Sequence, residues 1–413
     1  MMNHKTRTPL LVVATAFMFF VARPAASLEP TPQQQMWLEM VNRFRASPSA
    51  ELDILANYTQ PNGTSFANPS SDDPDVASAL SFFNVDAALL RNQFNALSPA
   101  PPLAWSTYLE DSARYYSNVI ISNDKQDHFL DGLGLFDRVT QNSDYDFTGG
   151  GSVGENIYAF TDSPFQGHAG FVIDWGFAAG GIQNPPGHRN SLLNPVFREI
   201  GISIVPESNS STEVGPFVVT QHLAVDFADG PFLTGVVFDD AVVADDFYSV
   251  GEGIGGLSVD VLQAGTTNVV ASTTTYASGG FDVDVGTGLF DVRIHGSSYD
   301  KLFTDLNFSN GENQKLDWIA STTTELLGDY NANGTVDAAD YTVWKDNFGS
   351  TSALDPDGNN NGVVDAADYT IWKDNFGNTQ TAVATHAVPE PATLASLVAM
   401  IAAVQMLRGK REL

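Results

Sequence analysis

Residues 329–378 contain one motif written twice, and this repeat restricts the local fold more than any other feature of the 413-residue chain. Each copy places side-chain oxygens at loop positions 1, 3, 5, 9 and 12, with glycine at position 6. Ca²⁺ binds about six to eight oxygens at roughly 2.4 Å, within a loop that turns back sharply at such a glycine. The sequence therefore predicts two calcium sites, with position 7 contributing a backbone carbonyl. The predicted ligands are Asp329, Asn331, Asn333, Thr335, Asp337 and Asp340, then Asp357, Asn359, Asn361, Val363, Asp365 and Asp368.

A short helix is predicted after each loop, because three aromatic residues recur at the i, i+3, i+7 spacing of one helix face. Glycine then follows each helix as its C-terminal stop. The stretch from Thr322 to Leu327 reads as a strand, so each unit is half of an EF-hand. The two aromatic faces are expected to pack together. The residues are Tyr341, Trp344, Phe348 and Gly349, repeated as Tyr369, Trp372, Phe376 and Gly377.

These paired half-hands, with Asp at position 12, resemble a type I dockerin over about 50 residues. The resemblance implies a small calcium-binding helical module and a cohesin-like partner. In that family, loop positions 10 and 11 help to choose the partner and are often polar, whereas this chain has Ala338-Ala339 and Ala366-Ala367. Three interpretations remain open: a docking module, a calcium-stabilised stalk that has no partner, and Asn-rich turns that bind no metal.

The chain is strongly acidic, with 49 Asp and Glu against 19 Lys and Arg, a formal net charge of −30. Nucleic acids and anionic lipids require clustered basic residues, so neither is expected as a partner. The absence of cysteine excludes disulfides, thiolate nucleophiles and cysteine-based zinc sites. A hydrophobic fraction of 43% provides enough apolar surface for folded domains.

Both ends of the chain have the pattern of processing segments. Residues 1–27 combine a basic start, an apolar run and small residues before the cleavage point, which is typical of a signal peptide. Residues 388–413 comprise a Pro-Glu-Pro box, an apolar stretch and a basic tail. This order resembles the PEP-CTERM sorting signal of Gram-negative bacteria. A short plain membrane anchor is the alternative.

The terminal segments predict export to the cell surface or the medium. A signal peptidase would remove the first segment. The sorting-signal resemblance implies transient anchoring in the inner membrane and cleavage by an exosortase-type protease.

Two larger modules lie between the ends. Residues 31–228 show helical periodicity and glycine-rich loops, whereas residues 231–320 alternate apolar and polar residues as half-buried strands do. The helical positions are Met36, Met40, Val41 and Phe44, then Leu109, Ala113, Tyr116 and Ile120. The alternating positions include Leu257, Val259 and Val261, then Phe281, Val283 and Val285.

An ordered series of short motifs runs through the first module. It includes Pro101–Trp105, Gly154-Glu155-Asn156-Ile157 and Gly187-His188-Arg189, and it closes with residues 219–227. The series resembles the bacterial branch of the CAP superfamily (SCP-like proteins). The resemblance implies an α-β-α sandwich with a cleft that displays two histidines and two acids.

By matching motif, His128 and His188 correspond to the two cleft histidines and Glu155 to one acid. Relatives usually place the other acid three residues after the tryptophan, where this chain has Ala178. Two imidazoles and a carboxylate can bind Zn²⁺ and leave a position for water, and Glu155 could then act as a general base. Three interpretations remain open: a structural or ligand-binding cleft, a metal site without turnover, and hydrolysis.

Other polar and aromatic residues of this module have simpler expectations. Arg138 is expected to pair with an acid, and Trp105 and Trp175 to lie in the core. His168, His222 and His295 match no motif position, and no Ser-His-Asp series can be read from the sequence.

The middle module begins Leu233–Asp240 and continues Gly251–Leu257, an order that resembles the Cna-B or carboxypeptidase-regulatory-like β-sandwich over about 90 residues. The resemblance implies a spacer. In calcium-binding relatives, acids of these loops share one ion, which makes Asp239, Asp245 and Glu252 candidate ligands. Solvated loop acids are the alternative.

The sequence thus predicts a multidomain protein: a CAP α-β-α sandwich, an all-β sandwich and a small calcium-binding helical module. Its expected function is to bind an extracellular matrix component or a small apolar ligand through the CAP cleft. The alternatives are a metal-assisted hydrolase of peptide or polymer and a docking subunit. Whether the chain is an enzyme stays open.

Overall fold

The computed structural model describes residues 29–296, 299–320, 326–331, 333–352, 356–359 and 361–379. The chain divides into two compact units, residues 1–322 and 323–413, and each is described by itself. The predicted signal peptide, the predicted sorting signal and most of the strand expected before the first loop lie outside the described residues. None of the helices in the described part of the chain combines the length and the apolar character needed to span a membrane.

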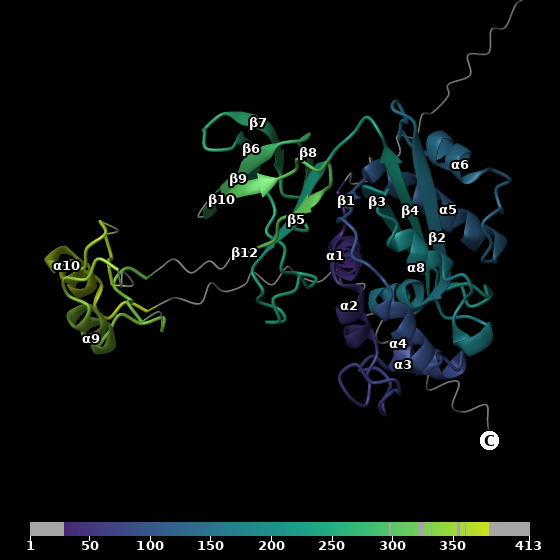
Figure 1. The fold of residues 1–413 in the computed structure, drawn as a ribbon, viewed down its shortest axis with the longest axis horizontal. Helices are drawn as coiled ribbons and strands as arrows, with labels where there is room; N and C mark the ends of the chain where they lie inside the picture. The colour runs from purple at the N-terminus through teal and green to yellow at the C-terminus, as the bar shows by residue number, and fades with distance from the viewer. Residues whose placement is uncertain are drawn as a thin grey trace, which may run out of the picture. The chain divides into compact units, whose positions relative to one another are not determined.

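The first unit begins with a domain built on a four-stranded sheet. The strands are β1 (Ala104–Trp105), β2 (Gly151–Thr161), β3 (Glu199–Pro206) and β4 (Phe217–Asp226). They lie in the order β1-β3-β4-β2, with β1 parallel to β3 and the other neighbours antiparallel (Figure 1). β2 is therefore an edge strand.

Helices cover both faces of this sheet. α5 (Thr107–Asn123) and α6 (Leu135–Asn142) lie on one face. The elements that pack toward the other face or extend its core are α1 (Pro32–Ala46), α2 (Pro48–Leu55), α3 (Pro74–Phe82), α4 (Ala87–Asn95), α7 (Pro164–Ala169), the π-helical turn η1 (Gly170–Asp174), the 3₁₀ turn η2 (Ala179–Gly181) and α8 (Gly187–Leu192). The predicted α-β-α layering is thus found in this domain.

Side chains along β3 and β4 point alternately to the two faces of the sheet, and apolar residues occur on both. On β3 and β4, Ile200, Ile202, Val219 and Leu223 join the larger core, which contains α1. Val218 and Ala224 belong to the clusters formed with α5. At Gly201 the helix approaches the strand so closely that an added Cβ would lie 2.0 Å from the backbone nitrogen of Glu110. This packing holds α5 against the sheet.

The strand-rich region folds as two facing sheets. One contains β11 (Gln314–Lys315), β5 (Phe232–Phe238) and β12 (Trp318–Ile319), with β8 (Gly280–Asp284) paired to β5. The other has the order β10-β9-β6-β7, formed by β6 (Ser258–Gln263), β7 (Val269–Thr274), β9 (Leu289–Gly296) and β10 (Tyr299–Asn307). Leu257, Val259 and Val261 are buried in the shared core, as the alternation predicts.

The β-sandwich packs directly against the N-terminal domain. Lys315 of β11 places Nζ 2.6 Å from Oε2 of Glu39 on α1. Asn313 donates to the carbonyls of Pro102 (3.0 Å) and Arg198 (2.8 Å). Gly280 lies so close to α1 that an added Cβ would meet Gln35 Oε1 at 1.9 Å. The region expected to be a spacer therefore shares a polar junction with the domain that precedes it.

The second unit contains two equivalent helices, α9 (Ala338–Asp346) and α10 (Ala366–Asn375). Each starts with a capping box, formed by Asp337 with Asp340 and by Asp365 with Asp368. The predicted aromatic faces meet, since Tyr341 and Trp372 have ring centroids 5.2 Å apart and Trp344 and Tyr369 5.1 Å. Each tryptophan also donates its indole N–H to the loop of the other copy, at 2.8 Å.

Candidate functional site

Glu155 lies at the centre of a hydrogen-bonded network on the sheet face that α5 covers. Strand register places it opposite His222 of β4, whose Nε2 is 2.9 Å from Oε2 of Glu155. His128, in the segment after α5, approaches the other carboxylate oxygen, with Nδ1 2.7 Å from Oε1. Arg138 of α6 places Nη1 2.5 Å from Oε2. Two imidazoles and a guanidinium therefore share one carboxylate.

Arg138 holds this network to the loop that precedes α6. Its Nε and Nη2 donate to the two oxygens of Asp131 at 2.8 and 2.9 Å. The guanidinium also stacks 3.5 Å from the ring centroid of Tyr116 on α5. The expectation that Arg138 pairs with an acid is confirmed, and the residue is buried by these contacts.

The network fixes the charge of Glu155. Burial acts to raise the pKa of this carboxyl, but the hydrogen bonds from His128 and His222 and the charge of Arg138 outweigh it and lower the pKa to about 2. Burial lowers the pKa of His222, and the contact with Glu155 offsets that effect only in part. Glu155 is thus ionised at neutral pH and an acceptor of all three bonds.

A serine completes an apparent Ser-His-Glu series that the sequence did not reveal. Ser112 Oγ lies 2.7 Å from His222 Nδ1, and the far side of the imidazole contacts Glu155. Neutral His222 donates from Nε2 to the carboxylate, so its Nδ1 is the acceptor that faces the Ser112 hydroxyl, which also lies 3.0 Å from the Leu109 carbonyl. Both Ser112 and His222 are fully buried between α5 and the sheet. This serine is inaccessible to a substrate and serves to orient the imidazole.

His188, at the start of α8, belongs to a different pair. Its Nδ1 lies 2.9 Å from Oδ1 of Asp174, and its backbone N–H donates to Oδ2 at 2.9 Å. Asp174 is fully buried, ends the π-helical turn and has a φ of 59°, in the left-handed region. Such turns and non-glycine left-handed residues are enriched at functional sites. The acid facing the second histidine thus directly precedes Trp175 instead of following it.

The three residues predicted to form the cleft site do not form one cluster. Successive side chains of a strand point to opposite faces. Glu155 faces α5, whereas the next residue, Asn156, contacts Gln221 (3.0 Å) and the carbonyl of His188 (3.5 Å). The structure brings Glu155 together with His128, and it pairs His188, at the start of α8, with Asp174.

This arrangement does not fit the predicted zinc site. Both oxygens of Glu155 already accept bonds from cationic or N–H donors, so neither is directed at a metal. Within the described residues, no group of three or more His, Asp or Glu side chains is arranged to hold a metal ion. His128, Glu155 and His188 therefore do not form a set of zinc ligands in this structure.

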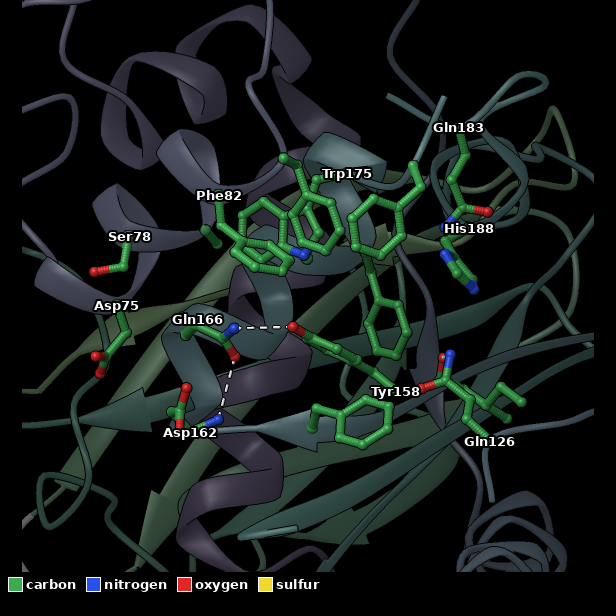
Figure 2. A pocket seen from close by; sticks show the side chains of 17 residues that line it. Asp75, Ser78, Phe82, Gln126, Tyr158, Asp162, Gln166, Trp175, Gln183 and His188 are labelled. Atoms are coloured by element: carbon green, nitrogen blue, oxygen red, sulfur yellow. Dashed lines mark hydrogen bonds between the residues drawn. The ribbon is translucent and has the colours of Figure 1, made fainter. Parts of the chain in front are cut away.

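A cleft of about 610 Å³ opens beside His188. Its lining includes Phe82 and Phe83 at the end of α3, Tyr158 of β2, and Trp175 and Phe177 after η1. Figure 2 shows Trp175, Phe82 and Tyr158 around the pocket, with Gln166 bonded to the Tyr158 hydroxyl at 3.0 Å. Phe82 and Phe177 are 70% and 88% exposed. The cleft thus combines an apolar interior with aromatic rings at its mouth.

Comparison with known proteins identifies the domain around this cleft. Residues 38–223 match the model of CAP, the cysteine-rich secretory protein family. The match confirms the CAP resemblance for these residues, and the β-sandwich and the paired loops lie outside it. Curated proteins provide no match.

One solved structure with similarity to this chain is an extracellular protein containing a SCP domain from Bacillus anthracis str. Ames. It is 21% identical, and the alignment covers 38% of this chain and 47% of that protein, with a TM-score of 0.23. The chain therefore spans less than half the length of that protein.

Two further histidines of the first unit pair with acids, and two of its tryptophans lie in the core. Trp105 and Trp175 are buried, as predicted. His168 of the CAP-like domain is fully buried and places Nε2 2.8 Å from Oε1 of Glu51. His295 of the β-sandwich pairs with Asp260 across two strands at 2.9 Å.

The candidate calcium ligands of the β-sandwich are arranged as turn-forming acids. Glu252 is buried, and its carboxylate accepts backbone N–H bonds from Val242, Val243 and Ser249 at 2.7–2.9 Å. The Asp245 side chain accepts from the backbone of its own turn and is exposed. Asp239 likewise accepts from a backbone N–H two residues ahead. These bonds favour the alternative of loop acids over a shared ion.

In the paired loops, the carboxylates of the twelfth positions point inward. Asp340 and Asp368 are fully buried, and Asp357 is nearly so. The backbone of Asn331 and Asp337 donates to Asp340 at 3.0 and 2.8 Å, with the same pattern in the second loop. Among the described residues, no Lys or Arg forms an ion pair with these carboxylates. In the part of the chain that the structure describes, the acids of neither loop are arranged around a common metal position, so calcium binding by these loops stays a prediction from the sequence.

Proposed function

We propose that this chain is an exported CAP-domain protein that binds an apolar extracellular ligand in the cleft beside His188. The observation that carries the proposal is the 610 Å³ aromatic cleft with two strongly exposed phenylalanines at its mouth. Exposed apolar surface next to a cavity is typical of a binding site. Export rests on the signal-peptide pattern of residues 1–27.

The geometry favours binding over hydrolysis. A general base works best with a pKa near the working pH, and Glu155, with a pKa of about 2, is a weak base held by three donors. Ser112 is buried and cannot reach a substrate. The residues predicted as catalytic, His128, Glu155 and His188, serve in this proposal to shape the loops around the cleft.

Binding of the neutral fluorophore N-phenyl-1-naphthylamine tests the cleft. Ser78 lines the cleft, whereas Ser81 is exposed on the same helix and does not. Ser78→Trp should remove most of the binding because it fills the cavity, and Ser81→Trp should leave it unchanged. Equal binding by both variants would place the probe elsewhere and contradict the proposal.

We also propose that the two loops each bind Ca²⁺ and that this ion stabilises the second unit. Buried carboxylates without cations repel one another, so calcium should raise the melting temperature by mass action. Calorimetry should find two sites in the full chain and one in Asp340→Asn. A full complement of sites in that variant would show that this carboxylate is not a ligand. Capture of a cohesin-like partner should require calcium.

A further inference from the structure

The mouth of the CAP-like cleft has an unusual concentration of rings. Phe83 contacts both Phe82 and Phe177 with ring centroids 5.0 Å apart, and it stacks on Trp175 at 6.4 Å. Phe82 and Phe177 are themselves 5.7 Å apart, at an interplanar angle of 69°. Edges and faces of four rings thus border one opening. Aromatic faces attract cations that approach within about 6 Å of a ring centroid.

Charged groups in the lining have one sign. Asp75 and Asp162 contribute carboxylates, and none of the described residues that line the cleft is lysine or arginine. Burial raises the pKa of Asp162, and the charges of Asp75 and Asp73 raise it further, which indicates that these carboxylates repel one another. A cation in the opening would relieve this repulsion, whereas an anion would add to it.

The other end of the cleft carries neutral polar groups. Figure 2 shows Asp75 and Asp162 on one side and His188, Gln126 and Gln183 on the other. Because Nδ1 of His188 contacts Asp174 at 2.9 Å, Nε2 is the ring nitrogen left to face a ligand. The carboxylates of Asp75 and Asp162 supply strong acceptors to the lining, which suits a ligand that brings positive charge or donors.

We propose that the cleft selects cationic ligands, namely an ammonium group attached to an apolar body. The apolar part occupies the aromatic interior, and the ammonium group lies against the rings and the carboxylates of Asp75 and Asp162. This inference rests on the proposed function and adds the chemical class of the ligand. Charge complementarity distinguishes this class from fatty acids, which share the apolar body.

Three probes with the same tail test the selection: octyltrimethylammonium, octyl glucoside and octanoate, titrated into the full chain at pH 8. Exposed ion pairs contribute up to about 1 kcal/mol, a factor of roughly five, so attraction and repulsion together should favour the ammonium over octanoate by about tenfold or more. Octyl glucoside should lie between them. Tetramethylammonium, which lacks the tail, should bind weakly.

Two double variants distinguish the effect of the cleft carboxylates from the effect of the overall charge of −30. Asp75→Asn/Asp162→Asn should weaken ammonium binding about fivefold and leave octyl glucoside unchanged. The control, Asp144→Asn/Asp146→Asn, removes two exposed charges that do not line the cleft and should have little effect. Equal losses in both variants would overturn the assignment to these acids.

The outcomes distinguish this inference from the function on which it rests. If octyl glucoside or octanoate binds most tightly, the cleft binds a ligand but the cationic preference is wrong. If none of the tailed probes binds, the proposed function fails and the preference fails with it. Ser78→Trp should abolish ammonium binding, because the site is the same cavity.

Discussion

Replacing Glu155 with glutamine should destabilise the CAP-like domain by roughly 2 kcal/mol at pH 7. The lowering of this pKa from 4.5 to about 2 corresponds to roughly 3 kcal/mol at about 1.4 kcal/mol per unit. Its side chain is 4% exposed, so solvent screening reduces this value little. Glutamine retains one carbonyl oxygen, and Arg138 keeps both bonds to Asp131. The loss is therefore smaller than the roughly 3–5 kcal/mol that follows when a buried charge loses its only partner.

The sign of the pH dependence provides a second measure of the same interaction. A carboxyl with a lowered pKa stabilises the fold fully above its unfolded pKa, near 4.5, and this stabilisation is lost as the pH falls toward 2. The wild-type chain should lose this contribution across that interval. Glu155→Gln has no such group, so the difference between the two proteins should shrink as the pH falls.

Urea unfolding followed by tryptophan fluorescence gives the free energy at each pH, because Trp37, Trp105 and Trp175 lie in the core of this domain. Glu213→Gln, an exposed glutamate, is the control and should change stability by less than about 0.5 kcal/mol. If Glu155→Gln is as stable as this control at pH 7, the network does not contribute as the contacts indicate.

Two further predictions concern the region where the CAP-like domain meets the β-sandwich. Burial, with the charges of Asp282 and Asp229, raises the pKa of Glu199 to about 7 despite its bond from Tyr145. The free energy of unfolding should therefore fall as the pH rises from about 4.5 to 7. Glu199→Gln should flatten this fall, and an unchanged pH profile in the variant would contradict the prediction. Lys315→Met should lower the free energy of unfolding by about 2 kcal/mol, because it leaves Glu39 buried without its cation. In a double-mutant cycle, Glu39→Gln/Lys315→Met should lose less stability than the two single variants together. Additive losses would show that the pair is not coupled.

The elements that could be predicted from the sequence are those whose burial follows a local period. The spacing of Leu109, Ala113, Tyr116 and Ile120 predicts α5, and all four side chains are fully buried. Val259 and Val261 alternate as β6 requires. In both cases one face of a single element meets one core, so the pattern depends on neighbouring residues alone.

Other features depend on contacts between distant segments. The pairing of Glu155 with His222 depends on the register between β2 and β4, which joins residues 67 positions apart. The junction at Asn313 and Lys315 consists of single polar residues that follow no period. The pair of His188 and Asp174 had one local signal, because Asp174 directly precedes Trp175. The contact between the two side chains, however, depends on the π-helical turn that ends at Asp174.

The separation of the two histidines gives each a distinct chemical setting. His128 is 45% exposed and joins a network in which the buried Arg138 is paired with the carboxylates of Asp131 and Glu155. His188 pairs with Asp174 alone and lies at a cleft whose other charged groups are carboxylates. The carboxylates at the cleft would repel an anionic ligand. Along β2, Glu155 faces α5 whereas Tyr158 lines the cleft, so the alternation of side chains keeps the network of His128 apart from the aromatic lining beside His188.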